Sequence, residues 1–165
     1  MNISVILIEI AVMLLGFTVL VFGMLLINPL TFISDYPPEI QAEYYRSQHK
    51  EATKKKLTKL MLAKKLLAVV AFLFLFAWML HLAGVKSFWQ GVGLAWAYML
   101  CLFAWDTFFL DWVLFANIRR VRLPGTGHME KEYHQKWFHV KVCLPVLPGA
   151  ILAGFISSGL MLWLW

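Results

Sequence analysis

Charge is scarce outside two short stretches of this 165-residue chain. Of its 15 Lys and Arg residues, all except Lys86 lie within residues 46–65 and 119–141. Hydrophobic residues make up 61% of the chain and are concentrated in long blocks, whereas soluble domains average about 45–50% apolar residues. This pattern excludes an ordinary soluble domain and indicates a membrane protein.

Cysteine is scarce as well. Cys101 falls near the middle of the third apolar block and Cys143 near the start of the fourth, so they are expected at different depths. A disulfide between them is therefore not expected, and the chain has no C-x-x-C redox pair. Both side chains are predicted to be small buried hydrophobic groups.

The first apolar block lacks the features of a signal peptide. No basic residue precedes it, and the segment Asn28-Pro29-Leu30 that follows is not a small-residue cleavage site. We therefore interpret residues 3–27 as a retained span.

Four apolar blocks are long enough to cross a membrane, which takes about 20 apolar residues. They cover about 3–27, 60–83, 92–116 and 142–165. The predicted fold is all-α: a polytopic membrane protein with four transmembrane helices, forming a single membrane domain over residues 1–165. No room is left for a separate soluble domain.

The two basic stretches predict the topology. Flanks rich in Lys and Arg stay cytoplasmic, so residues 28–59 and 117–141 are expected to form cytoplasmic loops and both termini to lie outside. The formal charge of +6 is assigned to this bias and to attraction to anionic lipid headgroups, not to nucleic acid. We expect a multi-pass protein of a bacterial inner membrane.

The first loop contains a pattern typical of a helix start. Asp35 stands at the expected capping position, Pro37 and Pro38 follow in the first turn, and Glu39 comes next. The resulting helix is expected to lie along the membrane. The lysines after it are interpreted as an anchor for lipid phosphates: Lys54, Lys55, Lys56 and Lys59.

The second loop predicts a turn and a second interfacial helix. Pro124-Gly125 is typical of a type II turn. A helix from about His128 to Val140 would place Met129, Tyr133 and Trp137 on one face.

The fourth span carries two further patterns. Ala150, Gly154 and Ser158 form a stripe of small residues that lets another helix approach closely, either from the same chain or from a second copy. Pro145 and Pro148 each remove a backbone donor and favour a kink near the cytoplasmic end.

Two acids in the third span are the sharpest candidates for chemistry. A carboxylate at membrane depth is costly and usually faces a partner. Asp111 is expected near the cytoplasmic end and Asp106 about 7.5 Å deeper, about 140° away around an α-helix, so the two need not line one cavity. Asp111 could pair with Lys64 or Lys65. Such a pair could fix the helix register, or the acids could form a substrate or proton site.

Five acids and histidines of the second loop are the other candidates: His128, Glu130, Glu132, His134 and His139. Their spacing is not H-E-x-x-H, and no cysteine joins them. We favour a polar helix face and predict no metal site, with a metal or acid–base site as the alternative. His139 is the best single candidate, because it is expected near Asp111 and a histidine exchanges protons near neutral pH.

A basic cluster precedes the Gly-rich turn of the same loop. It comprises Arg119, Arg120 and Arg122. Such a segment can hold a lipid phosphate or an anionic substrate through charge and backbone amides, or it can be a plain turn with positive-inside charges. The spacing of a nucleotide-binding P-loop is absent.

Two loop motifs resemble those of a set of small bacterial polytopic membrane proteins. The motifs are Asn28-Pro29 with Asp35-Tyr36-Pro37, and Asp111-Trp112 with Pro124-Gly125-Thr126. The resemblance covers mainly the two predicted cytoplasmic loops and implies neither a site nor an activity.

The favoured functional hypothesis is a membrane-embedded site that opens to the cytoplasmic leaflet. It would bind or process an amphipathic, anionic, lipid-like molecule. Asp106 and Asp111 would line it, His139 would act as acid or base, and the loop arginines with Lys64 and Lys65 would hold the anion.

Two other hypotheses stay open. One is a proton-coupled transporter that works as an oligomer, driven by protonation of Asp106 or Glu9. The other is an accessory or scaffold subunit bound to a partner membrane protein. Nothing in the sequence identifies a cofactor.

Overall fold

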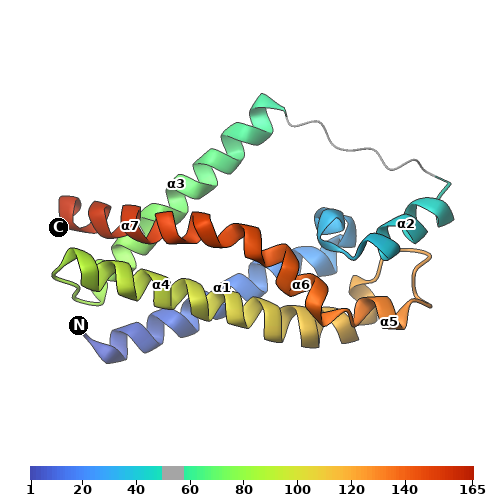
Figure 1. The fold of residues 1–165 in the computed structure, drawn as a ribbon, viewed down its shortest axis with the longest axis horizontal. Coiled ribbons are helices and arrows are strands. Elements are labelled where there is room, and N and C mark those ends of the chain that lie inside the picture. The colour runs from blue at the N-terminus through green and yellow to red at the C-terminus, as the bar shows by residue number, and fades with distance from the viewer. Residues whose placement is uncertain (50–57) are drawn as a thin grey trace. The chain divides into compact units, whose positions relative to one another are not determined.

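A computed structural model describes residues 1–49 and 58–165. The described residues form helices, turns and loops and contain no strand (Figure 1). The predicted lipid anchor at Lys54, Lys55 and Lys56 falls outside the described residues.

Eleven helical elements follow one another along the described chain. In order, they are α1 (Ile3–Ile27), η1 (Pro29–Asp35), α2 (Pro38–Ser47), α3 (Lys59–Leu82), α4 (Phe88–Trp105), η2 (Asp106–Phe115), η3 (Arg119–Val121), α5 (Glu130–Tyr133), α6 (Lys136–Cys143), η4 (Leu144–Val146) and α7 (Leu147–Leu164). η2 is a π-helix, whereas η1, η3 and η4 are short 3-10 helices.

Four helices are long and apolar enough to cross a membrane: Ile3–Ile27, Lys59–Leu82, Phe88–Phe115 and Lys136–Leu164. The all-helical class and the four candidate spans are thus confirmed. The first two spans agree with the predicted bounds to within one residue. The third begins earlier than predicted, where the Ser87 hydroxyl accepts a hydrogen bond from the Gln90 amide. The fourth also begins earlier, because α6 leads directly into η4 and α7.

The predicted capping role of Asp35 is wrong. Asp35 ends η1, which is capped at its other end by the Asn28 side chain accepting from the Leu30 amide at 3.0 Å. α2 begins later, at Pro38, and Pro37 holds the cap position without a side-chain bond. Asp35 is thereby left available for a different role.

The second loop contains the predicted turn but not the predicted continuous helix. Gly125 has φ +84°, and the Thr126 amide donates to the Leu123 carbonyl at 3.1 Å, as a type II turn requires. The helix expected from His128 to Val140 is instead divided into α5 and α6. Tyr133 is 1% exposed. The break between α5 and α6 allows its side chain to enter a buried core.

Contacts within the chain divide it into two units. The first comprises the described residues of Met1–Val12, Lys55–Cys101 and Val146–Trp165, and the second those of Met13–Lys54 and Leu102–Pro145. We describe each unit by itself.

In the first unit, α7 packs against α3 (Figure 1) and is hydrogen-bonded to α4. The Trp96 indole donates to the Ile151 carbonyl at 3.2 Å, and the Ser158 hydroxyl donates to the Phe88 carbonyl at 2.7 Å. Gly154 lies directly against the Trp96 indole. The small residues Gly154 and Ser158 therefore allow close packing within the chain, which is the intramolecular alternative for this stripe.

An intramembrane acid of the first unit also finds a partner. Glu9 on α1 accepts a hydrogen bond from the hydroxyl of Tyr98, which is fully buried on α4. The second carboxylate oxygen of Glu9 is buried and has no partner among the described residues. His81, at the end of α3, stacks on Trp165 with ring centroids 4.8 Å apart.

The packing of α7 on α4 predicts opposite effects for two Gly→Ala changes on one helix. In Gly154→Ala the new methyl group collides with the Trp96 indole, so we expect a loss of about 1–3 kcal/mol in unfolding free energy. In Gly159→Ala it meets open space, and the gain in helix propensity is about 1 kcal/mol. Denaturant unfolding in micelles measures both. Equal effects would contradict the described contact.

Candidate functional site

A buried aromatic cluster forms the base of the second unit. Tyr36, Phe115 and Tyr133 meet with ring centroids 4.9, 5.6 and 6.2 Å apart. Edge-to-face pairs of this kind add stability beyond their buried area. Three chain segments distant in sequence are thereby packed together: the end of η1, the end of η2 and α5.

Two tyrosine hydroxyls tie the segments further. Tyr36 donates to the Val121 carbonyl at 2.6 Å, and Tyr133 accepts from the Leu123 amide at 2.9 Å. Burial raises the pKa of both hydroxyls, so each stays protonated. The Tyr36 bond therefore joins the two predicted loops next to Asp35, and the Tyr133 bond joins two segments of the second loop.

The third span widens where its two acids lie. η2 runs from Asp106 to Phe115 as a π-helix, and the Ala116 amide donates to the Asp111 carbonyl five residues earlier. Hydrogen bonds from i to i+5 bring residues five apart to nearly the same face. Asp106 and Asp111 therefore face one side of the helix, and not the separate directions that an α-helix would give them.

One indole bond places α1 beside this segment. Trp105, at the end of α4, donates to the Thr18 hydroxyl on α1 at 2.9 Å. The Thr18 hydroxyl in turn donates to the Leu14 carbonyl at 2.8 Å. α1 thus supplies an apolar wall next to the two acids.

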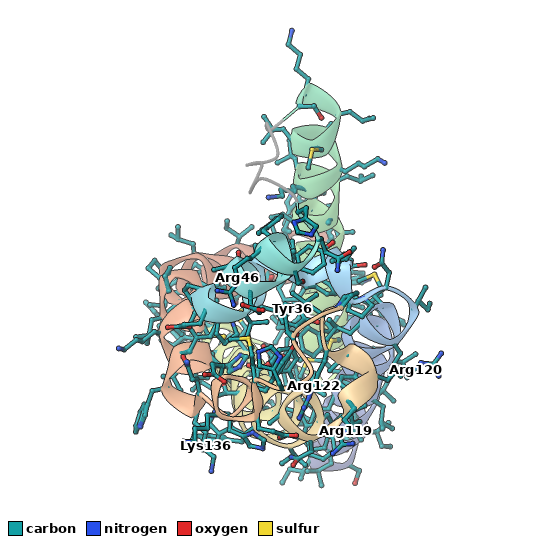
Figure 2. All side chains as sticks on the ribbon, turned by 90° about the vertical axis from the view of Figure 1, so that its right-hand side faces the viewer. Tyr36, Arg46, Arg119, Arg120, Arg122 and Lys136 are labelled. Carbon is teal, nitrogen blue, oxygen red and sulfur yellow. The ribbon has the colours of Figure 1, made fainter. Side chains whose placement is uncertain are left out.

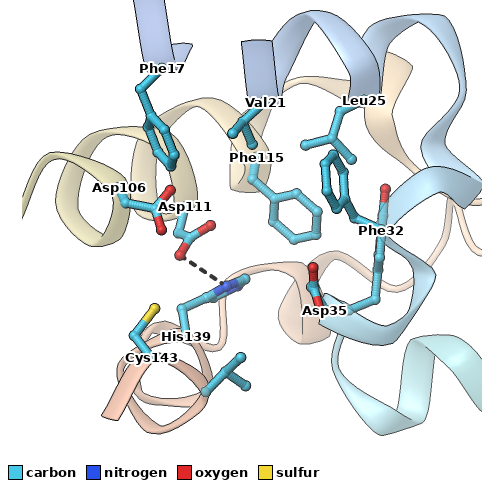
Figure 3. A pocket seen from close by; sticks show the side chains of 12 residues that line it. Phe17, Val21, Leu25, Phe32, Asp35, Asp106, Asp111, Phe115, His139 and Cys143 are labelled. Carbon is cyan, nitrogen blue, oxygen red and sulfur yellow. Dashed lines mark ion pairs between the residues drawn. The ribbon is translucent and has the colours of Figure 1, made fainter. Parts of the chain in front are cut away.

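These elements line a partly open cavity of about 240 Å³ (Figure 3). Apolar side chains of α1 form one wall, η1 another, and η2 and α6 the polar side. The lining comprises Phe17, Val21, Leu25, Phe32, Asp35, Tyr36, Asp106, Asp111, Phe115, His139, Val142 and Cys143. All three residues predicted as catalytic are among them.

His139 and Asp111 form an ion pair at the cavity. Nδ1 of His139 lies 3.2 Å from Oδ2 of Asp111, and the histidine side chain is 7% exposed. The ring packs edge-on against Phe115, with centroids 5.2 Å apart. Nε2 is buried and has no partner among the described residues. In Figure 3 the imidazole extends into the cavity between the two aspartates of η2 and Asp35.

The cavity is acidic on its polar side. It contains three carboxylates, one imidazole and one thiol, and none of its described lining residues is Lys or Arg. Sequence reasoning missed Asp35 as a site residue, because its position before two prolines is equally typical of a helix cap. Cys143 was expected to be a small buried group and is a half-buried free thiol at the cavity wall.

The three arginines predicted to bind an anion are not among the residues that line the cavity. Arg119 and Arg120 have exposed side chains (Figure 2). Arg122 donates two hydrogen bonds of 2.9 Å to the carboxylate of Glu130 and one of 3.0 Å to the Gly127 carbonyl. Lys64 and Lys65 are exposed on α3, in the other unit, so their pairing with Asp111 stays a prediction.

The ion pair between Arg122 and Glu130 stabilises the second loop. The arginine side chain is 6% exposed, and its guanidinium lies 5.0 Å from the centre of the Tyr133 ring. The hydrogen bonds lower the pKa of Glu130 and raise that of Arg122. Arg122 therefore braces the turn that carries the aromatic cluster.

The histidines of the second loop do not gather around one point. Nδ1 of His134 is hydrogen-bonded to the Glu130 carbonyl at 2.7 Å, whereas Nδ1 of His139 lies 3.2 Å from Asp111. Within residues 1–49 and 58–165, no three His, Cys, Asp or Glu side chains are placed to hold a metal ion.

Comparison of the chain with protein-family models, curated proteins and solved structures finds no match. The function has to be argued from the geometry of the cavity.

The buried hydroxyl of Tyr36 predicts a stability difference between two neighbouring tyrosines. Tyr36→Phe leaves the Val121 carbonyl without its donor, and we expect a loss of about 1–3 kcal/mol in unfolding free energy. Tyr45→Phe is the control, because Tyr45 is partly buried but its hydroxyl makes no bond within the described residues. Thermal unfolding compares the two. A larger effect at Tyr45 would contradict this bracing role.

The Arg122–Glu130 ion pair predicts that part of the unfolding free energy is lost at acidic pH. The pKa of Glu130 is lowered in the folded protein, so the stabilisation is fully present above the unfolded value of about 4.3 and is lost as pH falls through the folded value. In Glu130→Gln we expect this loss of stability at falling pH to be absent. In Glu132→Gln we expect the same loss as in the unmodified protein. Unfolding midpoints measured over a pH series below neutrality test this, and identical profiles for both variants would overturn the assignment.

Proposed function

We propose that this polytopic membrane protein binds an amphipathic molecule in the cavity of its second unit, with His139 and Asp111 as an acid–base pair. The supporting observation is His139, which lines the cavity and has a buried Nε2 without a partner among the described residues. Most buried polar atoms in proteins are hydrogen-bonded, so a buried polar atom without a partner beside a cavity supports a ligand there.

The geometry supports a proton-transfer role for His139. Nδ1 of His139 lies 3.2 Å from Oδ2 of Asp111. A proton on Nδ1, facing this carboxylate, makes Nε2 the acceptor of the ring. A base oriented by a carboxylate in this way is a common arrangement for general acid–base chemistry. Asp106, on the same face of η2, offers a second acceptor.

The predicted topology would place this cavity at the cytoplasmic side of a bacterial inner membrane. The charge bias of the loops supports a topology with both termini outside. The exposed Arg119 and Arg120 then face anionic lipid headgroups. Trp112 and Lys136 suit the same interface, since the lysine ammonium lies 5.1 Å from the centre of the indole ring.

The expected anionic ligand has less support than the site itself. The arginines that were to hold the anion are exposed or paired with Glu130, and the described cavity lining is acidic. Lipid phosphates are better assigned to the outer surface of the loops than to the cavity.

Proton-coupled transport is the second candidate. The observation that favours it is Glu9, which has one buried oxygen without a partner among the described residues. A transport rate in proteoliposomes that does not depend on a pH gradient would contradict proton-coupled transport.

The proposed site predicts a ligand that depends on Asp111. We expect native mass spectrometry of protein extracted gently from its own membrane to show a discrete bound molecule. In Asp111→Asn the occupancy should fall at least about tenfold, because the amide no longer orients His139 or balances a ligand charge. Glu132→Gln removes the same charge outside the cavity lining and should retain the ligand.

Two outcomes would count against the site. A ligand bound equally in all three proteins would lie elsewhere. A co-purifying protein subunit, with no small molecule bound, would favour the scaffold hypothesis, and the acids would then be structural.

A further inference from the structure

We infer that the polar head of the bound molecule is a primary or secondary ammonium group, carried on an apolar chain. This inference rests on the proposed function and names the chemical class of the ligand. Three independent features of the cavity support it: its charge, its hydrogen-bonding groups and its apolar walls.

The charge of the cavity favours a cation. Asp35 comes from η1, and Asp106 and Asp111 come from η2, so carboxylates approach the space from two elements. The other polar groups that line it are His139 and Cys143 of α6 and the hydroxyl of Tyr36, which is engaged with the Val121 carbonyl. Asp106 and Asp111 are half-buried on one face of η2, whereas Asp35 is exposed. Like charges that share a site disfavour one another, and a cation between them offsets this repulsion. A phosphate or sulfate would add to the repulsion.

The hydrogen-bonding groups favour a head that carries N–H donors. The carboxylates of Asp106 and Asp111 only accept when ionised, and Nε2 of His139 accepts because Nδ1 faces Asp111. A primary ammonium has three donors and can satisfy all three acceptors at once. A quaternary ammonium carries the same charge but has no donor, so it would leave Nε2 unpaired.

The rest of the lining suits an apolar chain attached to such a head. Phe17, Phe32 and Phe115 face the cavity, together with aliphatic side chains of α1 and α6. Aromatic faces attract cations as well as apolar groups. The volume of about 240 Å³ is below the roughly 300–1,000 Å³ of cavities that enclose drug-sized ligands. It therefore accommodates a head and the first carbons of a chain.

The test compares three compounds that carry different head groups on the same octyl chain. The protein, reconstituted in phosphatidylcholine nanodiscs, is titrated calorimetrically with octylamine, octyltrimethylammonium or octyl sulfate. Nanodiscs without protein give the partitioning background. We expect saturable binding of octylamine at least about tenfold tighter than that of either other compound. This comparison uses the unmodified protein and does not depend on the folding of a variant.

Two variants test whether octylamine binds in the cavity. In the double variant Asp106→Asn with Asp111→Asn, we expect octylamine to bind at least about tenfold more weakly. Glu132→Gln lies in the same unit outside the cavity lining and should bind octylamine like the unmodified protein.

The contradicting results separate this inference from the proposed function. Tighter binding of octyl sulfate would overturn the cationic head, and equal binding of octyltrimethylammonium would overturn the need for N–H donors. Either would leave the cavity as a binding site. If no compound bound above background, the ammonium assignment would be wrong, and the Asp111-dependent native ligand would still decide the proposed function. Octylamine binding unchanged in the double variant would place the amine outside the cavity.

Discussion

The i→i+5 turn of η2 is the constraint on which the candidate site depends. In a regular α-helix, Asp106 and Asp111 would point about 140° apart, so that one of them would face away from His139. The wider turn of η2 brings both to the same cavity. π-Helical turns are rare and occur frequently at functional sites. The presence of both Asp106 and Asp111 in the lining of one cavity follows from this change in backbone geometry.

The acids of the cavity and the arginines of the second loop lie in different places within the second unit. The acids Asp35, Asp106 and Asp111 line the cavity, whereas Arg119 and Arg120 lie on the exposed surface. Arg122 is the exception, and it acts as a brace: its side chain is almost fully buried against Glu130 and the Tyr133 ring. Exposed arginines thus occur in the same unit as a cavity whose described lining contains acids but no Lys or Arg. The aromatic cluster under the cavity fixes the walls, because its three rings come from segments far apart in sequence.

Hydropathy alone predicts the four spans, since length and apolar content decide them directly. It also singles out Asp106 and Asp111, because polar groups are costly in apolar blocks, whereas His139 is a candidate because it is expected near Asp111. Their convergence was not predictable, since periodicity assumes α-helical geometry and carries no sign of a π-turn. Asp35 was misread because a capping acid and a cavity acid look alike before a proline pair. The helix break at His134 depends on the burial of Tyr133, a tertiary contact that local propensity does not contain. The roles of the three arginines differ for the same reason.

The most direct test of this account is the tautomer of His139. Nitrogen NMR of protein with 15N-labelled histidine reports which ring nitrogen carries the proton, and His139→Gln identifies its signals among the five histidines. The account predicts a protonated Nδ1 that shifts in Asp111→Asn, together with an unprotonated Nε2 that responds to ligand. A ring protonated at Nε2 and unaffected by Asp111→Asn would contradict it. The cavity would then have no acid–base pair.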